Sequence, residues 1–245
     1  MYHLLRFKKQ RSGIVAVFFL LSSFSSFAQL RDAINLPDND DKAYHIGIVV
    51  MGVSSRFQIS QHPQFLKSDT VLGVVPENTI GLGIGGMHTF KIGNHWDARI
   101  VFPQLLFANK AITYYLKYPQ SGESAITKKN VESILLGVPV QIKYKSDRIN
   151  NFRVYMMAGG KWETDLSSKA RAKNAEDLVK LKSSDWGIEA GIGFNFYMRY
   201  FVLSPEIKIS NGISNVHSRD PSLKFSNVID KIQSRQIVFS LIFEG

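Results

Sequence analysis

Cysteine is absent from the chain of 245 residues. This excludes disulfide frameworks, cysteine zinc sites and thiol nucleophiles, and for an exported chain it also excludes a lipid anchor on an N-terminal cysteine. Long hydrophobic runs are scarce, and a mean hydropathy of -0.06 is too low for a helical membrane protein, whose spans each need about 20 apolar residues. Acidic residues number only 20 against 30 basic ones, a net charge of +10 that would suit nucleic acid or an anionic membrane surface.

The first 28 residues have the parts of a secretory signal peptide. Basic residues precede an uncharged stretch over 14–27, and Ser26 and Ala28 supply the small side chains of a cleavage site. An N-terminal membrane anchor is the alternative, but this stretch is short for a span of about 20 residues. Cleavage leaves a periplasmic lead over 29–43 and 26 basic against 20 acidic residues, a net charge of +6. Export argues against a nucleic-acid partner.

From residue 44 onward the chain alternates between apolar and polar residues with a period of two, which is typical of strands. In the clearest segment, the even positions from Trp186 to Phe196 are apolar, whereas the odd positions are glycine, glutamate or asparagine. Pro103 interrupts one segment, and a bulge is expected to shift the register of the first. The eight predicted strands cover 44–59, 79–90, 95–107, 134–144, 152–162, 186–196, 201–210 and 237–243.

The connections between these segments are alternately long and short. An even number of antiparallel strands with short turns at one rim and long loops at the other is the layout of bacterial outer-membrane barrels. We therefore predict an all-β fold over 44–245: an eight-stranded antiparallel up-and-down transmembrane barrel in the cell outer membrane, with short periplasmic turns and long extracellular loops. A soluble lipocalin-like barrel or a sandwich, with the apolar face inside, is the alternative.

Two features favour the membrane barrel. Aromatic residues lie at strand ends on the apolar face, as in the girdles at lipid–water boundaries, and Leu136 is predicted to face lipid at mid-bilayer. The polar face carries ionisable residues in mid-strand that would pair within a filled lumen. The predicted girdle residues are Phe90, Trp96, Tyr144, Phe152, Trp162 and Trp186. The predicted lumen network is Asp97, Arg99, Lys161, Glu163, Glu189, Glu206 and Lys208, joined by Lys143 and Arg153 and by Glu132 as a further counter-charge.

Loop charge and catalytic motifs are less informative. The predicted loops 108–130 and 167–183 have an excess of positive charge, which indicates either contact with anionic lipopolysaccharide or an acidic partner, or merely a solvated surface. The histidines of the mature chain lie in different elements without a recognisable catalytic spacing, so no catalytic, cofactor or metal site is expected. The glycines at 81, 83, 85 and 86 lack a following helix and are predicted to be small inward residues rather than a dinucleotide loop.

Several segments of the mature chain carry a family resemblance. They are Val131–Ser133 with Gly137–Ser146, Arg148 and Asn150–Tyr155; Asn35–Pro37 with His45–Gly47; Glu189–Tyr197; Ser204–Gly212; and Ile229–Arg235. Together they resemble the PorT family, which consists of outer-membrane barrel proteins of Bacteroidetes needed for type IX secretion and, in gliding species, for motility. The resemblance spans nearly all of the mature chain and keeps the strand order.

The resemblance implies a non-enzymatic component of the type IX secretion system that acts through contacts with other components. Lys143, Lys145, Arg148 and Arg153 would cluster near a periplasmic turn, where they would bind a secretion component of the outer membrane or periplasm, or else satisfy turn carbonyls and lipid phosphates. Asp230 and Arg235 flank the entry to the last strand and are predicted to clamp the last long loop. The alternatives are a stand-alone structural or adhesive barrel and, less favoured, a lipid A-modifying enzyme.

Overall fold

The structure is a computed structural model, and it describes residues 33–63, 65, 71–119, 124–167, 181–218 and 226–245. The predicted signal peptide over 1–28 lies outside the described residues. The predicted lead over 29–43 is described from residue 33 and contains a short 3-10 helix, η2 (Pro37–Asp41). Among the described residues, no helix has the length and apolar character needed to cross a membrane.

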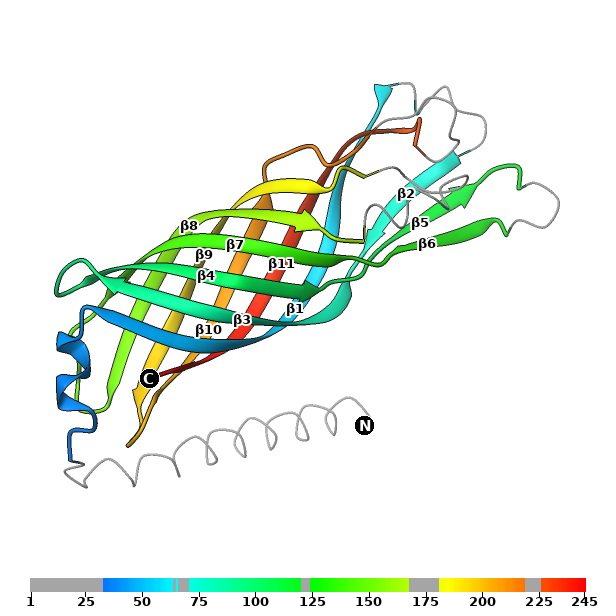
Figure 1. Cartoon of the computed structure of the whole chain (residues 1–245). Helices are drawn as coiled ribbons and strands as arrows, with labels where there is room; N and C mark the ends of the chain where they lie inside the picture. Colours follow the sequence, from blue (N-terminus) through cyan, green and yellow to red (C-terminus); the bar gives the residue numbers. More distant parts are fainter. Residues whose placement is uncertain (1–32, 64, 66–70, 120–123, 168–180, 219–225) are drawn as a thin grey trace, which may run out of the picture. The chain divides into compact units, whose positions relative to one another are not determined.

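Antiparallel strands close into a barrel in the order β1-β11-β10-β9-β8-β7-β4-β3 (Figure 1). They are β1 (Tyr44–Gln61), β3 (Thr79–Lys91), β4 (Trp96–Phe107), β7 (Ile134–Lys145), β8 (Phe152–Asp165), β9 (Ser184–Tyr197), β10 (Val202–Gly212) and β11 (Ile229–Glu244). Each pairs with its neighbour along the chain, and β1 pairs with β11 to close the ring. The predicted eight-stranded up-and-down barrel is therefore confirmed, although β11 begins at Ile229 rather than at 237.

The two ends of the barrel differ in the length of their connections. The short connections 92–95, 146–151 and 198–201 lie at one end, together with η2, and we call this the short-turn end (Figure 1). The connections 62–78, 108–133, 166–183 and 213–228 lie at the other, the long-connection end. The predicted asymmetry between short and long connections is confirmed.

A second sheet occupies two connections that the sequence predicted to be loops. Its strands, β2 (Val71–Glu77), β5 (Lys110–Leu116) and β6 (Ile126–Val131), pair in the order β2-β5-β6. The loop prediction for 108–130 is wrong over β5 and β6, because nearly every residue of β5 is buried and the strand therefore shows no alternation. The buried cluster that joins this sheet to the barrel contains Phe57, Val71, Val74, Ile112, Tyr114, Leu116, Val131, Val216, Val228, Ile229 and Ile232.

The outward face of the barrel is apolar and is bounded by aromatic side chains. Trp162 and Trp186 are paired on β8 and β9 toward the long-connection end, and their ring centroids are 6.5 Å apart. Phe152 and Phe196 meet at the short-turn end, with centroids 5.3 Å apart. Trp186 and Phe196 lie ten residues apart on β9, which is about 33 Å along a strand and about 25 Å in height at a tilt of about 40°. This height matches the apolar band of about 25 Å in outer-membrane barrels.

The depth of the β7 residues in the membrane can be read from their pairing with β8, where Trp162 marks the outer aromatic boundary. Val138 pairs with Trp162, whereas Leu136 pairs with Thr164, further toward the long-connection end. Leu136 therefore faces outward as predicted, but near the aromatic boundary rather than at mid-bilayer. Ile142, also exposed on the outward face, lies near the middle, because it pairs with Ala158 and Ala158 pairs with Ala190, about halfway between Trp186 and Phe196.

The inward face is charged in part and apolar in part. Gly81, Gly83 and Gly85 face inward as predicted, but Gly86 faces outward, because successive strand residues point to opposite faces and Gly86 follows the inward Gly85. The register of β1 shifts only at Ser60 and Gln61. An apolar layer also fills part of the lumen and contains Val49, Met51, Val53, Met87, Val101, Leu106, Ala108, Leu135, Val238 and Ile242.

Candidate functional site

An ion pair crosses the lumen between opposite sides of the barrel. Arg99 on β4 lies 2.5 Å from Glu206 on β10, and both side chains are 1% exposed. The Tyr155 hydroxyl donates to the same carboxylate at 2.8 Å. Lys143 Nζ lies 3.8 Å from the centroid of the Tyr155 ring, a cation–π contact. The carboxylate of Glu206 thus offsets the charge of Arg99 and accepts a hydrogen bond from Tyr155, and the Tyr155 ring in turn contacts the cation of Lys143.

Two more groups of polar contacts extend this network. Lys208 Nζ lies 3.8 Å from Glu189 and 4.0 Å from Glu206, and Gln141 donates to Glu189. Toward the long-connection end, Lys161 Nζ lies 2.7 Å from Glu163. Paired in this way, the buried charges avoid most of the penalty of an isolated charge in a dry interior.

The long-connection end of the lumen is also filled. Lys161 donates to Gln236 of β11 at 2.9 Å, and Ser234 donates to Asp185. Buried Lys110 of the small sheet stands over this layer, and a cavity of about 30 Å³ beside it has room for about two water molecules. Side chains therefore occupy the described lumen.

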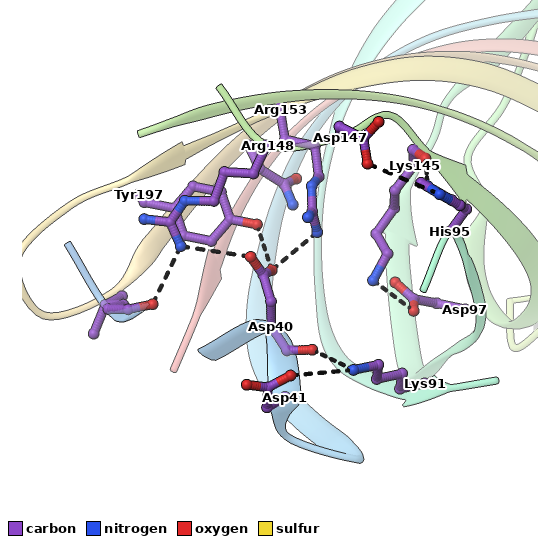
Figure 2. A network of polar contacts seen from close by, with 12 residues as sticks. Asp40, Asp41, Lys91, His95, Asp97, Lys145, Asp147, Arg148, Arg153 and Tyr197 are labelled. Atoms are coloured by element: carbon purple, nitrogen blue, oxygen red, sulfur yellow. Dashed lines mark hydrogen bonds and ion pairs between the residues drawn. The ribbon is translucent and has the colours of Figure 1, made fainter. Parts of the chain in front are cut away.

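A third cluster holds the lead against the short-turn end (Figure 2). Its centre is Asp40 of η2, whose Oδ1 accepts hydrogen bonds from Arg153 at 2.9 Å and from the Tyr197 hydroxyl at 2.8 Å. The Arg148 guanidinium lies 3.5 Å from Oδ2 of Asp40. Donors from β8, β9 and the β7–β8 turn thus converge on one carboxylate. We call this cluster the rim latch.

The backbone of the lead adds to the rim latch. Arg148 donates to the carbonyl oxygens of Asn35 and Leu36, and its guanidinium lies 3.6 Å from the centroid of the Tyr197 ring. The Asn35 N–H donates to Asn151 Oδ1 at 2.8 Å, and its side-chain amide donates to the Tyr197 carbonyl at 3.0 Å. The lead is therefore fixed at both its backbone and its side chains.

The family follows from a comparison with known proteins. A family model described as an outer membrane protein beta-barrel domain matches residues 27–218. The chain belongs to this family. The protein therefore lies in the outer membrane. Because barrels of this kind have short periplasmic turns and long extracellular loops, we assign the short-turn end to the periplasmic side and the long-connection end to the outside. No curated protein sequence matches the chain.

Solved structures with a similar course of the chain are small outer-membrane barrels. OprG from Pseudomonas aeruginosa is 14% identical with a TM-score of 0.43, covering 82% of this chain and 95% of its own. Neisserial surface protein A is 10% identical with a TM-score of 0.39, covering 81% and 96%. The attachment invasion locus protein of Yersinia pestis is 12% identical with a TM-score of 0.36, covering 83% and 100%.

The predicted lumen residues come together in part as expected. Arg99 pairs with Glu206, Lys161 with Glu163, and Lys208 with Glu189. Asp97 lies at the periplasmic end instead, 2.8 Å from Lys145 Nζ. The further lumen carboxylate is not Glu132, which is exposed, but the inward Asp185 and Glu244, which the sequence analysis missed.

The four predicted partner-contact cations point into the molecule. Lys143 is 1% exposed in the lumen and Lys145 is 6% exposed beside Asp97. Arg148 and Arg153 bind Asp40. The sequence analysis gave Lys143 both to the lumen and to the basic cluster at the turn. Its burial agrees with the lumen, and the turn cluster does not hold for Lys143 or Lys145, because alternate strand positions place both side chains in the barrel interior. The missed residue is Asp40, whose side-chain contacts with Arg148, Arg153 and Tyr197 lie more than 100 positions away in sequence.

The predicted clamp residues Asp230 and Arg235 do not act together. Asp230 is exposed, and its carbonyl oxygen accepts from Asn215. Arg235 lies on the outward face of β11 opposite Arg56. Among the described residues, the carboxylate of Asp230 and the guanidinium of Arg235 form no ion pair. The clamp prediction is therefore wrong in its geometry, because both residues belong to β11 rather than to a loop.

The extracellular cations are less available than the sequence predicted. Lys110 is buried, and Lys128 pairs with Glu77. Hydrogen bonds from Lys128 and from Thr113 lower the pKa of the Glu77 carboxyl, which keeps this carboxylate charged at neutral pH. Most of the other predicted basic loop, 167–183, lies outside the described residues. Two of the lysines in the predicted loop 108–130 are thus buried or paired within the small sheet and are less available to an outside partner.

We expect Asp40→Asn to release the lead. The change removes the charge that Arg148 and Arg153 share, and we expect the free energy of unfolding to fall by about 1–3 kcal/mol. Hydrogen exchange over 35–43, followed by mass spectrometry, should accelerate. The control is Asp38→Asn, an exposed carboxylate of the same helix, which should change stability by less than about 0.5 kcal/mol. Equal exchange in both variants would contradict the rim latch.

Proposed function

We propose that this outer-membrane barrel is a non-enzymatic component of type IX secretion that acts by binding other secretion components. The resemblance to the PorT family supplies the process. The observation that carries the mode of action is the occupied lumen, where ion pairs such as Arg99–Glu206 join opposite strands. A lumen filled in this way offers no path for a folded substrate, so its contribution comes from its surfaces.

The periplasmic rim is the surface we propose for partner contact. Lys145, Arg148 and Arg153 are engaged within the chain, whereas three carboxylates point outward: the side chains of Asp41 and Asp147 are 87% and 93% exposed, and Asp38 is also exposed. Lys42 and Arg199 are exposed at the same end. A periplasmic partner would therefore meet these surface carboxylates beside two cations rather than the basic cluster expected from sequence. Opposite charge would favour a basic partner surface.

The test combines a deletion strain with co-purification. We expect deletion to stop export of secretion substrates, and we expect the tagged full-length protein, cross-linked in outer membranes, to retain secretion proteins. The variant Asp38→Asn/Asp41→Asn/Asp147→Asn should lose at least half of the retained protein while still assembling. Lys42→Gln, a neutralised cation next to η2, is the matched control. Normal export in the deletion strain together with no co-purified secretion protein would refute the proposal and favour a stand-alone structural or adhesive barrel.

A lipid A-modifying enzyme is the remaining alternative. One contact deserves a direct test, because His217 Nε2 lies 2.9 Å from Ser226 Oγ, a pairing that sequence spacing did not reveal. Both residues are buried, His217 at 4% and Ser226 at 0% exposure, which leaves no access for a substrate in the described structure. We expect the lipid A mass spectrum to be the same in wild-type, deletion and Ser226→Ala strains.

A further inference from the structure

Two arginines face each other on the outward surface of the barrel. Arg56 of β1 and Arg235 of β11 are direct cross-strand partners, and both side chains are partly exposed. Like charges directly opposite on neighbouring strands repel each other. Among the described residues, neither guanidinium forms an ion pair or hydrogen bond. Of the carboxylates near them in sequence, Glu77 is engaged by Lys128 and Thr113, and Asp230, five residues before Arg235 on β11, forms no ion pair with it among the described residues.

The arginines line a cleft with room for a polar group. Its volume is about 170 Å³, and its walls are Ser54, Arg56, Asn78, Arg235 and Ile237. Two guanidinium groups and neutral donors from the Ser54 hydroxyl and the Asn78 amide thus surround one space. A planar guanidinium group can donate two parallel hydrogen bonds to two oxygens of one phosphate. The lining is therefore that of an anion site, with one apolar wall at Ile237.

The cleft lies at the outer edge of the apolar band. Arg235 pairs with Asn211, and Asn211 pairs with Ile188, two residues from Trp186 of the outer aromatic boundary. Below the cleft, the outward residues of β11 are Ile237 and Phe239, both about half exposed. A phosphate at the cleft would thus lie at headgroup level while acyl chains cover these side chains.

We propose that Arg56 and Arg235 bind the phosphate of a phosphorylated glycolipid headgroup in the outer leaflet. The unpaired guanidinium groups, the cleft between them and its level at the membrane boundary carry this inference. It is independent of the proposed secretion role, since it requires only residence in the outer membrane. It also differs from a contact through the extracellular loops, because both arginines lie on barrel strands.

Native mass spectrometry of the full-length protein in detergent micelles tests the site with lipid A as the probe. We expect the wild-type protein to bind bisphosphorylated lipid A at least tenfold more tightly than its dephosphorylated form. Arg56→Gln/Arg235→Gln should lose this preference. Lys42→Gln/Arg199→Gln removes two exposed cations at the periplasmic end and should bind as the wild type does. The heat-dependent electrophoretic mobility of each variant confirms that the barrel has assembled.

Three results would overturn the proposal. The first is equal binding of lipid A by the wild type and by assembled Arg56→Gln/Arg235→Gln. The second is full displacement of lipid A by millimolar inorganic phosphate, which would assign the cleft to a free anion. The third is unchanged lipid A binding together with loss of an acidic protein from outer-membrane pull-downs, which would assign the arginines to a protein contact.

Discussion

Glu206→Gln is expected to lower the free energy of unfolding by about 3–5 kcal/mol, the usual cost of removing one partner from a buried ion pair. The carboxylate is 1% exposed and lies between Arg99, Lys208 and the Tyr155 hydroxyl. Without its charge, Arg99 and Lys208 remain in a lumen from which bulk water is largely excluded. Denaturant titration of the assembled barrel in lipid vesicles, followed by tryptophan fluorescence, measures the change.

Removing both charges of the Arg99–Glu206 pair should lower the free energy of unfolding much less than removing one of them. Arg99→Met/Glu206→Leu removes both charges and replaces them with apolar side chains, a change that is often neutral or stabilising. The double variant should therefore unfold within about 1–2 kcal/mol of the wild type. Asp147→Asn, at a side chain 93% exposed, controls for loss of a carboxylate and should stay within about 0.5 kcal/mol. A small effect of Glu206→Gln alone would mean that the lumen is wetter than the structure indicates.

Ile142→Arg is expected to cost about 2–4 kcal/mol of folding free energy in a bilayer, because an arginine on the lipid face is most unfavourable at the midplane. Ile142 is 44% exposed on the outward face and pairs with Ala158, which pairs with Ala190, about halfway between Trp186 and Phe196 on β9. Its neighbours across the sheet, Ala98 and Ala158, offer no carboxylate. The fraction of protein that assembles into lipid vesicles, and its stability there, measure the effect.

Leu136→Arg is the matched control on the same strand and face. Leu136 pairs with Thr164 beyond the Trp162 level, so the guanidinium can reach the headgroup region. Its cost should be only about 0–1 kcal/mol. Equal costs at the two positions would place the bilayer elsewhere on the barrel, and tolerance of both would contradict a lipid-facing surface.

The barrel strands could be predicted because each has one lipid-facing side and one lumen side. The two environments therefore select apolar and polar side chains at alternate positions, as between Trp186 and Phe196. The small sheet escaped prediction for the opposite reason: β5 is buried almost throughout, so its residues carry no period of two. Leu136 faced the expected side, but its depth depends on strand stagger, which only the pairing with β8 reveals.

The inward position of the lumen charges could be predicted in the same way, but their partners could not. Arg99 and Glu206 lie on strands separated by half of the ring, and no local pattern links them. The contacts of the rim latch are even harder to predict from the sequence, because Asp40 belongs to a polar lead without periodicity and contacts Arg153 and Tyr197 only in the folded chain. Lys143 and Lys145 illustrate the ambiguity: both lie close to a turn in sequence, where a partner contact was predicted, but their strand positions place both side chains inside the barrel.

The seam between β1 and β11 constrains how the protein is made. Their register runs from Gly47 opposite Glu244 to Gln61 opposite Ile229, so the first strand to leave the translocation machinery must wait for the last one. Until then, two sheet edges stay open and invite pairing with other chains. A nascent chain that ends before Ile229 could pair β1 with β3 but would lack β11, the strand that closes the ring. Periplasmic holding factors and the insertion machinery would thus have to protect nearly all of the barrel strands until synthesis of the chain ends.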